Sequence, residues 1–111
     1  MIEFESEALS LKILVTAFDA FDGESTNPAL EAVHRLDTHI GEHVITKLEI
    51  PTVFHESKNV ICKALKEDTY DVVLAIGQAG GRFEITPERV GINIDDARIP
   101  DNKGNQPIDK V

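Results

Sequence analysis

The sequence is poor in positive charge. Lys and Arg number 11 among 111 residues against 20 Asp and Glu, which leaves a formal net charge of −9 at pH 7. Proteins that bind nucleic acids gain affinity by releasing phosphate counterions, and an acidic chain is unsuited to this. Anionic membranes are disfavoured for the same electrostatic reason. We therefore expect neither nucleic acid nor membrane among its partners.

Cysteine is almost absent, and long apolar runs are missing. The single cysteine, Cys62, cannot form an internal disulfide. No apolar stretch approaches the roughly 20 residues of a membrane span or resembles a secretion signal. These features favour a cytoplasmic protein. With 41% hydrophobic residues the chain can bury one core, so we expect an acidic tail over residues 1–10 and part or all of one domain over residues 11–111.

The chain does contain a regular alternation of strand-like and helix-like segments. Residues 11–17, 43–50 and 71–76 have strand-like patterns, and the last of these is typical of a strand buried on both faces. Asn27 and Pro28 are favourable first residues for a helix that reaches about residue 40, and a second helix is predicted over residues 54–66. This order predicts an α/β fold with a parallel sheet and helices on its faces.

Parallel strands share one carboxyl edge, and the loops at that edge are where such sheets bind ligands. These loops contain Phe18 and Phe21 after the first strand, Thr52 after the second, and the glycine-rich residues 77–82 after the third. Glycine permits positive φ angles, so backbone N–H groups can face a ligand. The sequence therefore predicts a pocket for a small flat ligand with both apolar and amide character.

Standard cofactor and metal motifs are missing. Residues 77–81 match neither the dinucleotide-binding glycine pattern nor the Walker loop. The acidic segment 101–105 fails as a calcium loop, because Lys103 occupies a position that needs an oxygen ligand. The four histidines, at positions 34, 39, 43 and 55, show no metal-binding spacing with Cys62. We expect no metal and no cofactor.

Cys62 and Glu88 are the residues to consider for chemistry. Cys62 lies in the middle of the second predicted helix and faces away from its apolar stripe, whereas a reactive cysteine needs a helix N-terminus or an adjacent base. We therefore interpret Cys62 as inert. Glu88 stands at the start of a second apolar alternation, residues 89–94, beside the glycine turn. Two interpretations of Glu88 remain open, a working carboxylate or a structural partner of Arg82 or Arg89.

A longer set of motifs resembles one family. The segments Gly77-Gln-Ala-Gly-Gly-Arg82, Ile85-Thr-Pro-Glu-Arg-Val90 and Asp95-Asp-Ala-Arg-Ile-Pro-Asp-Asn102 look like those of pyroglutamyl peptidase I, also called pyrrolidone-carboxylate peptidase. The earlier segments Phe18-Asp-Ala-Phe21, Asn27-Pro28 and Pro51-Thr-Val-Phe54 occur in the family's order. The resemblance covers about residues 11–111.

This resemblance implies a three-layer α/β/α sandwich with a mainly parallel sheet, of which the chain would form the N-terminal half. It also implies a cytosolic cysteine peptidase that removes N-terminal pyroglutamyl residues from peptides with a Cys, a His and a Glu. By resemblance, Glu88 would orient the histidine and Arg98 would help to form an oxyanion site. The residues implied in lactam binding are Phe18, Phe21, Thr52, Gln78 through its main chain, and Ile99.

The chain also departs from the family pattern. The family's cysteine and histidine belong to a C-terminal half, and neither occurs before Val111. We therefore expect a truncated fragment that is inactive alone, with exposed apolar surface that makes it poorly stable or self-associating as a homo-oligomer. The alternative is a non-catalytic lactam-binding or protein-interaction module. The residues unusual for the family are Ala17, Ala20, Asp22 and Gly91, and a positive φ at residue 17 or 22 would strain the pocket loop.

Overall fold

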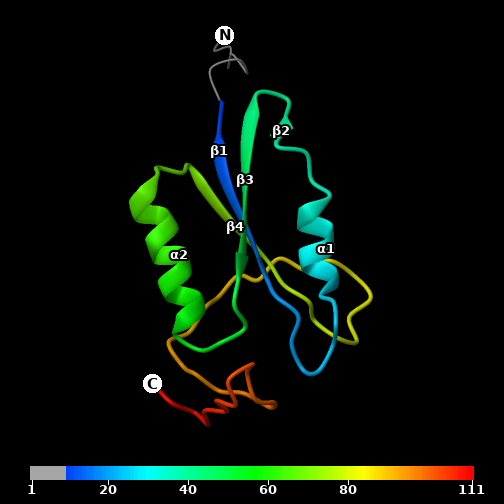
Figure 1. Cartoon of the computed structure of the whole chain (residues 1–111), viewed down its shortest axis with the longest axis vertical. Helices are drawn as coiled ribbons and strands as arrows, with labels where there is room; N and C mark the ends of the chain where they lie inside the picture. Colours follow the sequence, from blue (N-terminus) through cyan, green and yellow to red (C-terminus); the bar gives the residue numbers. More distant parts are fainter. Residues whose placement is uncertain (1–9) are drawn as a thin grey trace.

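The computed structural model describes residues 10–111, so the tail expected over residues 1–10 lies, apart from Ser10, outside the described residues. In chain order the elements are β1 (Lys12–Phe18), α1 (Pro28–His34), β2 (His39–Ile40), β3 (His43–Ile50), α2 (Glu56–Glu67) and β4 (Val72–Ile76). The strands form one sheet in the order β2-β3-β1-β4, with the helices beside it (Figure 1). The predicted α/β class is confirmed.

Strand β1 lies in the middle of the sheet. It pairs in parallel with β3 along its whole length and, on its other side, in parallel with β4. The chain passes from β1 to β3 and then back across β1 to β4, so crossovers of the same hand place α1 and α2 on opposite faces (Figure 1). The loops that follow β1, β3 and β4 therefore lie together at one end of the sheet, the lower end in Figure 1.

The core lies mainly between the sheet and α1. Residues four apart on a helix share a face, and Ala29 and Val33 of α1 are both buried. Val33 clusters with Val15 and Ala17 of β1 and with Ile45 of β3. None of the side chains of α2 is fully buried. The α1 face of the sheet is therefore the well-packed face.

The first helix ends earlier than predicted. The other predicted elements are found within two residues of their expected bounds, but α1 ends at His34 instead of about residue 40. His39 and Ile40 form β2, which pairs antiparallel with β3 across the two-residue turn Gly41–Glu42. Gly41 has a φ of 60°, which suits the first central position of a tight hairpin turn. This hairpin therefore occupies the residues that were predicted to continue the helix.

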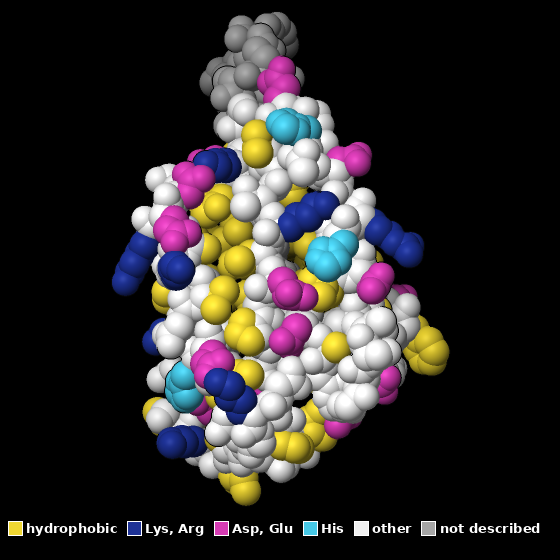
Figure 2. All heavy atoms as spheres, viewed as in Figure 1, with side chains coloured by type: hydrophobic (Ala, Val, Ile, Leu, Met, Phe, Trp, Pro, Cys, Tyr) yellow, Lys and Arg dark blue, Asp and Glu magenta, His cyan; other side chains and the backbone are white. Residues whose placement is uncertain are grey.

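The burial predicted for the third strand is wrong. Val72, Val73 and Leu74 of β4 are between 40% and 49% exposed, because β4 is an edge strand and α2 contacts β3 but not β4. The apolar alternation over residues 89–94 is not a strand in the structure, and its side chains Val90 and Ile92 are also exposed. Figure 2 shows apolar side chains gathered on the face beside α2. Within residues 10–111, no helix is long and apolar enough to cross a membrane.

The start of α1 is as predicted. The Asn27 side chain accepts a hydrogen bond from the Ala29 N–H at 2.9 Å and donates one to the Asp19 carbonyl at 3.1 Å. Asn27 is only 2% exposed, so neither bond is replaced readily by water. This residue therefore both caps the helix and attaches it to the loop that follows β1.

We expect Asn27→Ala to lower the free energy of unfolding by about 2 kcal/mol, because it removes a helix cap and leaves buried polar groups unpaired. Asn27→Asp keeps the cap acceptor and should cost less. Urea denaturation of both variants, with Ser25→Ala at an exposed neighbouring position as the control, measures the difference. An Asn27→Ala midpoint equal to that of Ser25→Ala would contradict the assignment.

Candidate functional site

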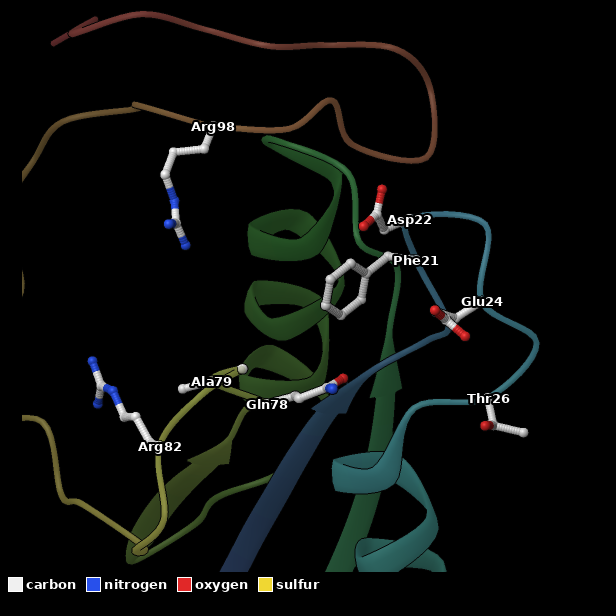
Figure 3. Close-up of a pocket in the computed structure, with 9 residues that line it drawn as sticks. Phe21, Asp22, Glu24, Thr26, Gln78, Ala79, Arg82 and Arg98 are labelled. Carbon is white, nitrogen blue, oxygen red and sulfur yellow. The ribbon is translucent and has the colours of Figure 1, made fainter.

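A cavity of about 490 Å³ opens at the carboxyl end of the parallel strands. Three segments that are distant in sequence form its walls: the loop after β1, the loop after β4, and the irregular segment near the C-terminus (Figure 3). Its lining residues are Phe21, Asp22, Glu24, Thr26, Gln78, Ala79, Gly80, Arg82 and Arg98. The pocket therefore lies at the edge where the sequence predicts one.

The loop after β1 supplies the aromatic wall. Phe21 directs its ring into the cavity in Figure 3. Asp22 has a φ of 55° and Gly23 a φ of 73°, so the chain turns through two left-handed residues directly after Phe21. The strain anticipated at residue 22 is therefore present, and an aspartate tolerates this region better than most residues. Ala17 lies in β1 with regular strand pairing, so residue 17 needs no glycine.

The loop after β4 supplies the polar wall. Gln78, Ala79 and Gly80 line the cavity directly after the strand, and Gly81 turns the chain with a φ of 84°. Arg82 lies beyond this turn, and its guanidinium donates a hydrogen bond to Glu88 Oε1 at 3.0 Å. The same guanidinium donates to the Thr86 hydroxyl at 2.9 Å. The wall therefore continues through Arg82 to Glu88.

Glu88 was expected at the start of a strand-like alternation, but no strand follows it in the structure. Its segment has no regular structure, and its side chain is 74% exposed. Of the two partners considered for Glu88, the structure pairs it with Arg82 and leaves its role in chemistry a prediction. Cys62 lies in the middle of α2 and outside the residues that line the cavity. The Cys62 side chain is half-buried. The side chain of Ile61, which belongs to the apolar stripe of the predicted helix, is half-buried too, so burial does not distinguish the two residues in the way that was predicted.

The segment near the C-terminus brings Arg98 to the cavity. Asp95 and Lys110 form an antiparallel bridge, and the Gln106 side chain donates to the Arg98 carbonyl at 3.0 Å. Figure 3 shows Arg82 and Arg98 on one side of the cavity, with Asp22 and Glu24 on the other. The cavity therefore offers hydrogen-bond donors on one side and acceptors on the opposite side.

The structure brings together part of the predicted site. Phe21, Gln78 and Arg98 line one cavity, whereas Phe18, Thr52 and Ile99 are not among the residues that line it. Ile99 is 41% exposed. Of the remaining lining residues, Ala79, Gly80 and Arg82 belong to the glycine-rich segment that the sequence predicts at this edge, whereas Asp22, Glu24 and Thr26 were not selected. The position of these three in the same loop as Phe21 is the signal that could have identified them.

Thr52 supports the cavity through Asp19, which sequence reasoning also missed. The Thr52 N–H and hydroxyl both donate to Asp19 Oδ1, at 2.8 and 2.7 Å. The Asp19 N–H donates to the Ile50 carbonyl at 2.9 Å. The loop after β1 is therefore held against the loop after β3.

A second cavity, of about 400 Å³, lies at the start of α2. His55, with a φ of 68°, has its Nε2 3.2 Å from Asp95 Oδ2 in that cavity. The His55 side chain is 74% exposed. No residue is shared between the linings of the two cavities, so His55 does not belong to the site formed by Phe21, Gln78 and Arg98.

Asp101 anchors the segment that carries Arg98. Its carboxylate accepts hydrogen bonds from the Asn105 side chain at 3.0 Å and from the backbone N–H groups of Phe54, Asn105 and Lys103 at 2.8, 2.8 and 2.9 Å. Partial removal of water from the Asp101 carboxylate would by itself raise its pKa. The hydrogen bonds outweigh that effect and lower the pKa of Asp101 to about 2.

Comparison with known proteins defines the class of the fold and then the family. The crystal structure of pyroglutamyl peptidase I from Bacillus amyloliquefaciens superimposes with a TM-score of 0.86 at 49% sequence identity, over 91% of this chain and 50% of that one. A mutant pyrrolidone carboxyl peptidase from Pyrococcus furiosus gives a TM-score of 0.85 at 40% identity. The family model for pyroglutamyl peptidase matches residues 11–111, and the chain belongs to this family.

Curated relatives agree with this membership. The pyrrolidone-carboxylate peptidase of Staphylococcus haemolyticus is 77% identical over 99 residues, which are 89% of this chain and 47% of the relative. The corresponding peptidase of Clostridium perfringens is 60% identical over 89% of this chain and 46% of its own length. The chain thus spans about half the length of the curated relatives it matches.

The hydrogen bonds to Asp101 predict a pH dependence. Because folding lowers the pKa of Asp101 from 3.8 to about 2, the ionised carboxylate stabilises the fold fully above pH 4. This contribution is lost as the pH falls through about 2. We expect the backbone amide proton resonances of Phe54 and Asn105 to shift with a midpoint near 2.

NMR titration between pH 5 and pH 1.5 measures these shifts. The range includes both the ordinary pKa of an aspartate and the lowered pKa of Asp101. In Asp101→Asn the same two amide resonances should show no such transition. A midpoint near 3.8 in the parent chain would show that the hydrogen bonds do not favour the ionised carboxylate.

Proposed function

We propose that this chain provides the pyroglutamyl-binding part of a cysteine peptidase that removes pyroglutamyl residues from the N-termini of peptides. Membership of the pyroglutamyl peptidase family supports this proposal. The observation that carries it is the meeting of Phe21, Gln78 and Arg98, from three distant segments, around one cavity. These three are among the residues that family resemblance selects from the sequence.

The cavity suits a lactam ring chemically. Such a ring has apolar carbons, a carbonyl that accepts hydrogen bonds and an N–H that donates one. Phe21 provides an aromatic surface for the carbons. The arginines on one side can donate to a carbonyl, and the backbone beside Gln78 offers both a donor and an acceptor. We assign Arg98 to the oxyanion site of the proposed reaction.

We infer that these 111 residues bind a pyroglutamyl group without hydrolysing the peptide bond. Hydrolysis needs an activated nucleophile, and Cys62 lies mid-helix in α2 and outside the lining of the cavity. We assign to Glu88 the orientation of a histidine that a further part of the enzyme supplies. The relatives, about twice as long, have room for that part.

A second candidate function is protein interaction without catalysis. The side chains of Phe83 and Ile85 are completely exposed, and those of Val90 and Ile92 are exposed as well. Apolar groups exposed in one segment are typical of surfaces that bind another polypeptide. Purification of the chain from its native source, followed by intact-mass measurement of every component, separates the two candidates. A partner without a reactive cysteine would favour the interaction module.

Binding of a pyroglutamyl ligand tests the proposed site directly. We expect pyroglutamyl amide to bind the parent chain, and Phe21→Ala to raise the dissociation constant about tenfold through the loss of ring contact, which is ~1.4 kcal/mol. NMR titration measures both constants. The matched control is Phe83→Ala, because the Phe83 ring is fully exposed and lies outside the cavity. Equal weakening in both variants would rule out Phe21 as the aromatic wall.

The role of Glu88 is testable in a chimera that joins, after Val111, the remaining part of the Staphylococcus haemolyticus relative. We expect Glu88→Gln to lower kcat far more than it raises KM. The fall in kcat should correspond to a loss of a few kcal/mol of transition-state stabilisation. The reason is that its negative charge matters most when an imidazolium forms. Steady-state hydrolysis of a pyroglutamyl anilide gives both constants. Glu84→Gln, at an exposed position in the same segment, is the control.

A kcat for Glu88→Gln within about threefold of the parent, less than 1 kcal/mol, would show that the carboxylate only partners Arg82. A rise in KM without a fall in kcat would also reject the catalytic assignment, because it would place Glu88 on the substrate.

A further inference from the structure

The Asp19 side chain accepts several hydrogen bonds close to the loop that carries Phe21. It follows β1 directly, and its Oδ1 accepts hydrogen bonds from the Thr52 N–H, the Thr52 hydroxyl and the Asn102 side chain, at 2.8, 2.7 and 3.1 Å. The Asp19 carbonyl accepts a further bond from the Asn27 side chain. One residue thereby connects four segments of the chain.

Asn102, in the segment near the C-terminus, donates to the same network. Its Nδ2 donates to Asp19 Oδ1 and also to the Ala20 carbonyl at 2.8 Å, 82 positions away in the sequence. Its backbone N–H donates to the Thr52 carbonyl at 3.0 Å. Ala20 immediately precedes Phe21, so Asn102 is bound to the backbone from which the aromatic ring projects.

The loop that carries Phe21 needs an external support. Asp22 occupies the left-handed region at a φ of 55°, a conformation that persists in a non-glycine residue only where the surroundings hold it. The hydrogen bonds from Asn102 and Thr52 act on Asp19 and Ala20, directly before this strained turn. The network is therefore placed to determine where the Phe21 ring lies.

The network also connects the loop that carries Phe21 to the segment that carries Arg98. Asn102 lies four residues after Arg98 and directly after Asp101, whose carboxylate accepts the Phe54 N–H at 2.8 Å. The segment that carries Arg98 is thus attached at Phe54 and at Ala20. A change in this network would move the loop that carries Phe21 and the segment that carries Arg98 relative to each other.

We infer that Asp19 and Asn102 are positioning residues that hold Phe21, and with it the lactam site, in a binding-competent arrangement. This inference rests on the proposed function for its effect on pyroglutamyl binding. The placement of the ring itself is independent of that function and can be measured in the chain without ligand.

The test uses a reciprocal exchange. Asn102→Asp removes the donor and places a second carboxylate beside Asp19, so the two side chains repel. Asp19→Asn keeps an acceptor oxygen for Thr52 and adds an NH₂ group. In the double variant that NH₂ group can donate to the new carboxylate at position 102, which restores the contact between the two side chains but not the hydrogen bond to the Ala20 carbonyl. Asn59→Asp, at an exposed position on α2, controls for added charge.

Two readouts are made on each variant. NMR relaxation of the Phe21 ring without ligand should show a mobile ring in Asn102→Asp, a less mobile ring in the double variant, and an ordered ring in the parent and Asn59→Asp. The dissociation constant of pyroglutamyl amide should rise about tenfold in Asn102→Asp, as expected for loss of a charge-assisted contact, and return to within about threefold in the double variant. Urea denaturation establishes that each variant is folded.

The outcomes separate the two proposals. A parent chain that does not bind pyroglutamyl amide would reject the proposed function, while the ring measurement would still decide the role of the network. A Phe21 ring that is equally ordered in Asn102→Asp and the parent would overturn the inference. A ring as mobile in the double variant as in Asn102→Asp would overturn the role of the contact between Asp19 and Asn102. If Asn102→Asp does not fold, Asn102→Ala removes the donor without adding charge and is judged by the same two readouts.

Discussion

The parallel pairing of β1 with β3 on one side and β4 on the other is the constraint on which the rest of the structure depends. Because these strands run in the same direction, the loops after them emerge at one end of the sheet. Phe21, Thr52 and Gln78 reach the same neighbourhood for this reason, although the loops have no regular structure of their own. Side-chain hydrogen bonds to backbone groups, such as those of Asp19 and Asn102, then fix the loops in place.

The sequence predicted the features that depend on short-range chemistry. Strand and helix periodicity located the elements, and Asn27 and Pro28 marked the start of α1 correctly. The end of α1 was missed because β2 is stabilised by pairing with β3, which a local pattern does not contain. Asp19 was missed for a similar reason, since its partners Thr52 and Asn102 are 33 and 83 residues away. Resemblance does not depend on such distances, and it selected Phe21, Gln78 and Arg98, which line the cavity, together with Phe18 and Ile99, which do not.

The error over β4 has a physical explanation. An apolar run of Val and Leu is typical of a strand with cover on both faces and a neighbour on each edge. In the described part of the chain β4 has β1 on one edge only, and its side chains Val72, Val73 and Leu74 remain substantially exposed. A net charge of −9 opposes association of identical copies at low ionic strength, whereas the open edge and apolar face favour pairing. Salt screens the repulsion and leaves the apolar attraction, so self-association of this chain remains a prediction that high salt favours.

Glu88 shows that the structural and catalytic interpretations of one residue need not exclude each other. Arg82 lines the cavity and pairs with Glu88, so the guanidinium connects the carboxylate to the site. Their side chains are 51% and 74% exposed, and an ion pair so exposed contributes only about 0–1 kcal/mol. A charge-assisted hydrogen bond from an imidazolium, made in a site closed to water, is stronger than this pair. The proposed transfer of this carboxylate from Arg82 to a histidine would therefore cost little free energy.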